Sequence, residues 1–128
     1  MSVEPVKILL VEDNEDDASL ILRALRRGGY APFWQRVETA EALDRALADH
    51  RWDIVLCDCV LPQFNGVSAA RRVRGCTTGV PVVMVSGERD EEMALAGMQA
   101  GAAAYVRKDR LAQLAAVVRQ HLERLPEV

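Results

Sequence analysis

The stretch Asp53-Ile54-Val55-Leu56-Cys57-Asp58 places four apolar residues directly before a carboxylate. An apolar run that short, with two β-branched members, predicts a buried central strand of a parallel sheet. In α/β sheets the carboxyl ends of the strands open into the crevice where ligands bind. We therefore interpret Asp58 as a functional carboxylate displayed at such an end. From this stretch alone, a polar strand end or a helix cap is an equally good interpretation.

The rest of the chain alternates between short apolar runs and amphipathic segments. Further strands are expected at residues 6–11, 32–37, 81–85 and 103–106. Helices are expected to begin at Asn14 or Glu15, after Thr39, and at residues 88–90. A third helix is expected at about 67–73, followed by a loop at 75–79, and the last helix at about 110–125. This alternation predicts an α/β fold: a doubly wound, flavodoxin-like, five-stranded parallel sheet with helices on both faces. The order 2-1-3-4-5 fits, because Pro32 and polar residues make 32–37 an edge strand.

Bulk properties narrow the class of protein. We expect one domain over residues 1–128, with a core at about 6–125 and no output domain. The net charge of -3 argues against a nucleic-acid partner, and no apolar run is long enough to span a membrane, so a cytoplasmic location is expected. Three cysteines do not make a disulfide framework. Cys57 and Cys59 are interpreted as small buried hydrophobes, with a metal-binding pair as the alternative.

Four of the five expected strands end in chemically active side chains: Glu12 and Asp13, Asp58, Ser86, and Lys108. The carboxyl ends of parallel strands share one edge of the sheet, so these side chains should converge. Three carboxylates in one pocket repel each other unless cations neutralise them. Lys108 is one cation, and Mg²⁺, which prefers oxygen ligands, is the expected second.

The expected ligands of the magnesium ion differ in their roles. Asp13 and Asp58 are candidates for direct ligation, the longer Glu12 for ligation through water, and the Val60 carbonyl for a further oxygen. A carboxylate beside Mg²⁺ can attack a phosphoryl group and form an aspartyl phosphate. In such a reaction the metal and an ammonium group neutralise the phosphoryl oxygens, and Ser86 would supply a hydroxyl donor.

In this order and spacing, these pieces resemble the receiver domain of two-component response regulators over about residues 6–125. The matching pieces are Glu12-Asp13-Asn14, the 53–58 stretch, Leu61-Pro62 with Gly66, Ser86-Gly87, and Tyr105 three residues before Lys108. The resemblance implies that Asp58 is the phosphoacceptor and that Mg²⁺ is held by Glu12, Asp13, Asp58 and the Val60 carbonyl. It further implies that Ser86 and Lys108 bind the phosphoryl group and that Ser86 and Tyr105 form the switch.

The same resemblance implies the partners. The phosphoryl donor would be a phosphohistidine on a sensor histidine kinase or a histidine phosphotransfer protein. The phosphorylated form would act on a downstream protein target or an output domain, and the fourth and fifth helices are candidate faces for a homodimer. Beyond Mg²⁺-dependent self-phosphorylation and slow self-dephosphorylation, no enzymatic activity is expected.

Two positions depart from the family pattern. Asp109 follows Lys108 where these domains usually have a cis proline, so a trans bond and an added negative charge near the acidic edge are expected. Val60 cannot orient an attacking water, which predicts slow self-dephosphorylation.

Three other classes of protein fit less well. A pseudo-receiver that binds partners without phosphotransfer is the main alternative. A haloacid-dehalogenase-like phosphohydrolase would need a second aspartate at the position of Val60. The acidic edge would repel the phosphate of a flavin, which disfavours a flavodoxin-like cofactor carrier.

Overall fold

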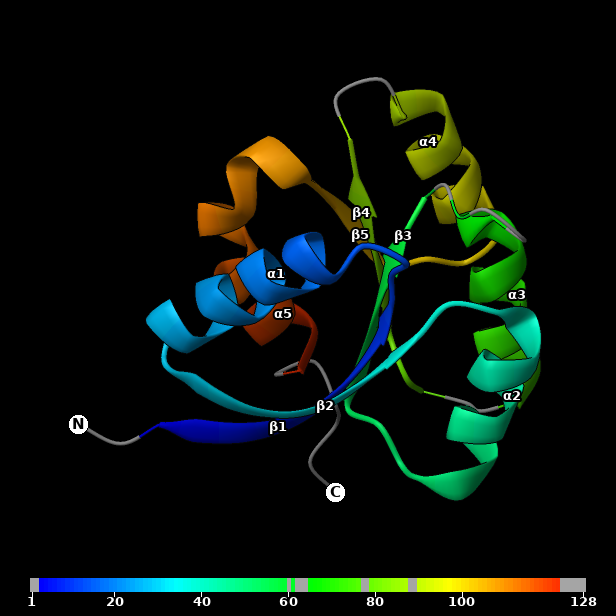
Figure 1. Ribbon diagram of the computed structural model, residues 1–128. Helices are drawn as coiled ribbons and strands as arrows, with labels where there is room; N and C mark the ends of the chain where they lie inside the picture. Colours follow the sequence, from blue (N-terminus) through cyan, green and yellow to red (C-terminus); the bar gives the residue numbers. More distant parts are fainter. Residues whose placement is uncertain (1–2, 60, 62–64, 77–78, 88–89, 123–128) are drawn as a thin grey trace.

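The five strands of the protein form one parallel sheet in the order β2-β1-β3-β4-β5 (Figure 1). The structure, a computed structural model, describes residues 3–59, 61, 65–76, 79–87 and 90–122. The strands are β1 Glu4–Val11, β2 Tyr30–Val37, β3 Ile54–Asp58, β4 Val82–Ser86 and β5 Ala104–Arg107. The predicted fold class and strand order are therefore confirmed, including β2 at the edge.

Helices cover both faces of this sheet, as Figure 1 shows. The helices are α1 Glu15–Arg27, α2 Ala40–Asp49, α3 Gly66–Cys76, α4 Glu91–Gln99, the 3₁₀ helix η1 Lys108–Gln113, and α5 Leu114–Leu122. Side chains of α1 and α5 pack on one face with Ile8, Leu10 and Leu56, and those of α2, α3 and α4 pack on the other with Leu9, Val55 and Cys57. None of the described helices has the combination of length and hydropathy needed to cross a bilayer.

Strand β3 has an apolar run because it is buried on both sides. All five of its residues are buried, with Ile54 and Leu56 facing the α1 and α5 layer and Val55 and Cys57 facing the opposite layer. A strand covered by helices on both faces has no solvent side on which polar residues would alternate. Asp58 is consequently the first residue of β3 that reaches a functional edge.

The helix starts are set by local capping. The Asn14 side chain accepts a hydrogen bond from the Asp17 amide at 2.9 Å, and the Thr39 hydroxyl accepts one from the Ala42 amide at 3.1 Å. Each cap satisfies an amide that has no partner within its own helix. The capping of α1 matters for function, because it fixes the turn that directly follows Glu12 and Asp13.

Two helix boundaries were predicted wrongly. The third helix was expected at about 67–73, with a loop from Gly75, but α3 continues through Gly75 to Cys76. A glycine weakens a helix by about 1 kcal/mol relative to alanine without necessarily ending it, and buried Val73 anchors this last turn. The last helix was expected to run from 110, but Arg110 has non-helical angles and the 3₁₀ helix η1 comes first. Leu111 and Leu114 pack on the core with the three-residue spacing of a 3₁₀ turn. Residues 123–125 lie outside the described part of the chain.

Gly66 closes the loop that follows Asp58, and we expect Gly66→Ala to lower the free energy of unfolding by about 1–3 kcal/mol. A Cβ atom at Gly66 would lie 2.2 Å from Met84 Cε and 3.0 Å from the Asp58 carbonyl oxygen. Gly75 is the matched control, because nothing lies within 4 Å of its added Cβ. Gly75→Ala should leave stability unchanged or raise it. Urea unfolding of both variants checks this, and equal effects would contradict the steric argument.

Candidate functional site

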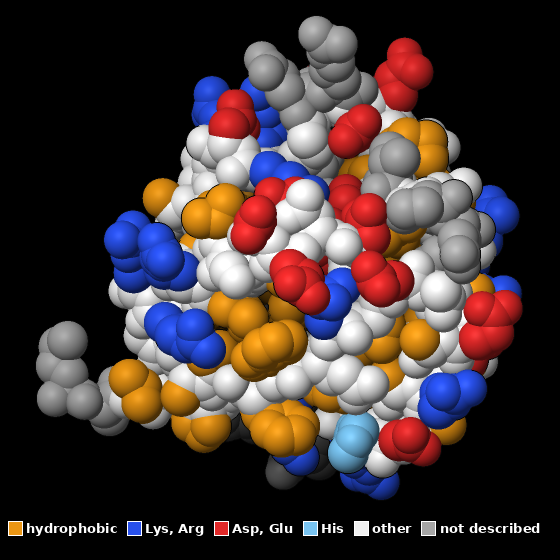
Figure 2. Space-filling model, in the orientation of Figure 1, with side chains coloured by type: hydrophobic (Ala, Val, Ile, Leu, Met, Phe, Trp, Pro, Cys, Tyr) orange, Lys and Arg blue, Asp and Glu red, His pale blue; other side chains and the backbone are white. Residues whose placement is uncertain are grey.

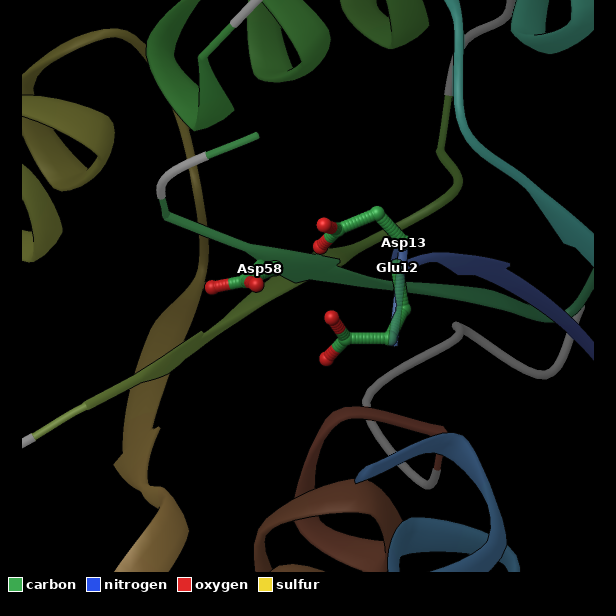
Figure 3. Close-up of side chains that lie close together, drawn as sticks. All are labelled: Glu12, Asp13 and Asp58. Atoms are coloured by element: carbon green, nitrogen blue, oxygen red, sulfur yellow. The ribbon is translucent and has the colours of Figure 1, made fainter. Parts of the chain in front are cut away.

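Three carboxylates meet at the edge where β1 and β3 end (Figure 3). Glu12 and Asp13 directly follow β1, and Asp58 is the last residue of β3. These strands are neighbours, with Val11 opposite Cys57, so Glu12 comes level with Asp58. One oxygen from each carboxylate lies within 4.8 Å of the others, close enough to hold one metal ion. The sequence prediction that these residues converge is correct.

Lys108 lies against this cluster and neutralises part of its charge. It directly follows β5, and its Nζ lies 3.0 Å from Glu12 Oε1 and 3.3 Å from Asp58 Oδ2. The shortest contact, at 2.7 Å, goes to Asp17 Oδ2 in the first turn of α1. Figure 2 shows acidic side chains gathered over this part of the surface, near the start of α1.

Asp17 is the site residue that sequence reasoning missed. Acidic residues in the first turn of a helix are explained by the helix dipole, so Asp17 carried no separate signal. It lies 91 residues from Lys108 in the chain, and the α1 and η1 segments come together only through the fold. The spacing of residues within a short stretch of sequence cannot predict a contact between residues so far apart in the chain.

The charges of the site perturb the pKa values of Glu12 and Lys108. Burial, then a hydrogen bond and charge repulsion from Asp58, raise the pKa of Glu12 from 4.5 to about 7. Burial lowers the pKa of Lys108, but its contacts with Asp17, Glu12 and Asp58 outweigh that effect and leave the pKa raised. In the folded protein the neutral form of the buried Glu12 carboxyl group is therefore favoured, whereas Lys108 remains an ammonium group.

Glu12 should make the metal-free protein less stable as the pH rises. Its carboxyl has a pKa of about 7 when folded against 4.5 as the ordinary value, so between these pH values the folded state binds more protons. The free energy of unfolding then falls as pH rises through this window. Urea unfolding in EDTA at several pH values measures the slope. The isosteric variant Glu12→Gln should reduce it, and an unchanged slope would assign the effect to another group.

Ser86 ends β4 beside the cluster. Val85 is paired with Asp58, and Ser86 follows it as a buried residue with 1% exposure. The Ser86 hydroxyl has no hydrogen-bond partner within the described part of the chain. A buried hydroxyl without a partner costs free energy, so it is suited to a ligand that brings acceptor oxygens. Val60, whose carbonyl was predicted to bind metal, lies outside the described residues.

Comparison with known proteins identifies the family. The family model described as response regulator receiver domain matches residues 8–119. The chain belongs to this family. The receiver domain is 34% identical over 119 residues to the transcriptional regulatory protein PrrA of Mycobacterium tuberculosis, covering 92% of this chain and 50% of that protein. It is 28% identical to PhoB, a phosphate regulon transcriptional regulatory protein of Pseudomonas aeruginosa, covering 88% of this chain and 52% of PhoB.

Solved structures match the receiver domain over nearly its whole length. A putative response regulator from Chloroflexus aurantiacus has a TM-score of 0.83 at 28% identity, with 94% of this chain and 100% of that chain covered. The receiver domain of the sensor histidine kinase PA1611 from Pseudomonas aeruginosa has a TM-score of 0.77 at 30% identity, with 93% and 98% covered. A magnesium ion is coordinated in the active site cleft of that structure. The chain spans about half the length of the curated relatives described above.

Asp109, which departs from the family pattern, is paired within its own segment. Its carboxylate lies 2.8 Å from Arg107 Nη2, so part of its charge is neutralised there. None of the described peptide bonds is cis, as expected for the bond after Lys108. Among the described residues, the additional acid that contacts Lys108 is Asp17.

Tyr105 and the two cysteines lie next to the site without joining it. The Tyr105 ring is half-buried, and its hydroxyl lies 3.5 Å from Glu91 Oε1, the limit of a hydrogen bond. Cys57 and Cys59 are buried in the core, as predicted. Burial raises the pKa of both thiols, that of Cys59 to about 12. Neither cysteine belongs to the group of potential metal ligands found among the described residues, which is Glu12, Asp13 and Asp58, and this disfavours the alternative of a cysteine metal pair.

Proposed function

We propose that this receiver domain is a phosphorylation switch in which Asp58 accepts a phosphoryl group from a phosphohistidine in the presence of Mg²⁺. The observation that carries the proposal is the arrangement of Glu12, Asp13 and Asp58 around one point with Lys108 against them. Asp58 belongs to this group of carboxylates and also contacts the ammonium group of Lys108, at 3.3 Å. Its side chain is 9% exposed, which limits competition from water.

The donor atoms suit Mg²⁺ rather than a transition metal. Carboxylate oxygens are the ligands that Mg²⁺ prefers, and it usually takes one or two of them and keeps several waters. Glu12, with its raised pKa, would ionise when a second cation is added. The Pseudomonas aeruginosa receiver domain that contains magnesium supports the same choice. When bound, Mg²⁺ supplies positive charge to the phosphoryl oxygens.

The proposed transfer requires one bond to form and one to break. An oxygen of the Asp58 carboxylate attacks the phosphorus atom, and the bond between phosphorus and the imidazole nitrogen breaks. The electron pair of that bond returns to the imidazole, which takes a proton from solvent. Lys108 donates to a phosphoryl oxygen as charge develops there, and the Ser86 hydroxyl donates to another. We propose no turnover of other substrates, and slow self-dephosphorylation because Val60 carries no polar side chain.

Phosphorylation would act on the surface of the domain through Ser86 and Tyr105. In this proposal Ser86 moves toward the phosphoryl oxygens, and the Tyr105 ring turns into the space it leaves. This rotation breaks the long contact with Glu91 and changes the face formed by α4, β5 and α5. That face is the proposed site of homodimer contact or of a downstream protein target.

The proposed partners follow from the chemistry and the relatives. A sensor histidine kinase or a histidine phosphotransfer protein in the cytoplasm would supply the phosphohistidine. PrrA and PhoB are transcriptional regulatory proteins about twice as long as the matched region. An output domain, or a separate protein target, would receive the signal here, with no direct contact between this domain and nucleic acid.

Beryllofluoride, a phosphoryl mimic, tests the proposal against the alternative of a pseudo-receiver. With Mg²⁺ it should bind the domain and raise its melting temperature, because it completes the aspartyl phosphate geometry at Asp58. No binding would favour a module that works without phosphotransfer. Phosphotransfer from a panel of sensor kinases would then identify the donor.

A further inference from the structure

We propose that Asp17 is a positioning residue for Lys108 in phosphoryl transfer to Asp58. The inference rests on the proposed function and assigns a role to a side chain outside the metal-binding cluster. Asp17 makes the shortest of the three contacts of Lys108 Nζ, 2.7 Å against 3.0 Å for Glu12 and 3.3 Å for Asp58.

The backbone of Asp17 is fixed by the N-terminal cap of α1. This residue lies in the first turn of α1, where its amide donates to the Asn14 side chain at 2.9 Å. Its carboxylate is 33% exposed and Lys108 is 22% exposed, so the pair is partly shielded from solvent. A lysine side chain has four rotatable bonds and holds one position only when its ammonium group is anchored. The capped turn of α1 provides such an anchor.

Lys108 donates hydrogen bonds to Asp17 and Asp58 and forms an ion pair with Glu12. An ammonium group has three protons, and three carboxylates lie around it. When Asp58 becomes an acyl phosphate, its carboxylate charge is replaced by that of the phosphoryl oxygens. The proton directed at Asp58 then turns to a phosphoryl oxygen, the smallest change available to the side chain. Asp17 retains its contact throughout and keeps the ammonium within reach of the reacting group.

A negative charge near a phosphoryl group also has an opposite effect. Asp17 adds repulsion at the site, so removing its charge would by itself speed the uptake of a phosphoryl group. Positioning and repulsion thus predict changes of opposite sign. Asp16, the preceding residue, is exposed in the same turn and makes no ion pair within the described chain, which makes it the matched control for charge.

The test is the rate of phosphorylation by acetyl phosphate with Mg²⁺. Asp17→Asn should slow it about three- to tenfold, the effect of losing one charge-assisted hydrogen bond. Asp16→Asn should leave it unchanged or slightly faster, and Asp17→Glu should recover at least part of the rate. The affinity for Mg²⁺ should not fall in Asp17→Asn, since Asp17 is outside the cluster of Glu12, Asp13 and Asp58.

A double-mutant cycle distinguishes an effect through Lys108 from a general one. Asp17→Asn should weaken beryllofluoride binding in the wild-type background and have no such effect when Lys108→Ala is already present. An unchanged or faster rate in Asp17→Asn, or an equal loss in both backgrounds, would overturn the inference. If the Lys108→Ala protein binds beryllofluoride too weakly to measure, the rates of Asp17→Asn and Asp17→Glu are compared instead. A rate that Asp17→Glu does not recover would then overturn the inference. If the wild type takes up no phosphoryl group, the proposed function fails instead.

Discussion

Asp58→Asn should abolish phosphoryl uptake from acetyl phosphate and Mg²⁺, while the wild type gains one phosphoryl group by intact-mass spectrometry. The amide has nearly the shape of the carboxylate but lacks the anionic oxygen that attacks phosphorus. The pKa of Glu12 is raised by burial and, to a smaller extent, by Asp58; the same change removes the repulsion from Asp58, so the fold should be retained. This is the largest effect expected of any single substitution in the domain.

Asp53→Asn is the matched control for Asp58→Asn. Asp53 directly precedes β3, at the opposite end of the strand from Asp58, and accepts a hydrogen bond from the Lys7 amide at 2.8 Å. Asp53→Asn removes the same negative charge from the protein as Asp58→Asn does, but it leaves the carboxylates at the carboxyl end of the sheet unchanged. Full uptake by Asp53→Asn and none by Asp58→Asn would locate the acceptor. Uptake that persists in Asp58→Asn would mean that another carboxylate carries the phosphoryl group.

Asp13→Asn should change the stability of the domain in opposite directions with and without Mg²⁺. Without the metal, losing one of three clustered carboxylates relieves repulsion and should raise the free energy of unfolding, by about 1 kcal/mol or less. With the metal, the loss of a ligand should weaken binding at least about tenfold, so the variant gains less stability from Mg²⁺ than the wild type does. Urea unfolding in EDTA and in MgCl₂ measures both effects.

Asp16→Asn serves as the control for this reversal. Asp16 lies three residues away on the exposed side of the first turn of α1 and is not part of the metal-binding cluster. Its loss should change stability by the same amount in EDTA and in MgCl₂. A reversal in Asp16→Asn would indicate a general effect of charge. An equal response to Mg²⁺ in Asp13→Asn and wild type would exclude Asp13 as a ligand.

The sequence alone determined the fold class and the edge at which the site lies. A strand that is buried on both faces, such as β3, has a continuous apolar sequence. The polar residue that follows such a run therefore lies at the carboxyl end of the strand. Parallel strands share that edge, so Glu12, Asp13, Asp58, Ser86 and Lys108 could be brought together without coordinates. The end of α3 at Cys76 and the start of α5 at Leu114 were less predictable, because packing on the core overrode the local signals there.

Only the tertiary structure decided how the charges at that edge are paired. Asp17 and Asp109 look alike in the sequence, each an acid at the start of a helical segment. The packing of α1 against η1 brings Asp17 to Lys108, whereas Asp109 turns to its near neighbour Arg107. An ion pair depends on the distance between two side-chain ends, and for residues 91 positions apart that distance is set by the packing of whole elements. The sequence could therefore name the residues of the candidate site, and the fold alone determined which acid contacts the lysine most closely.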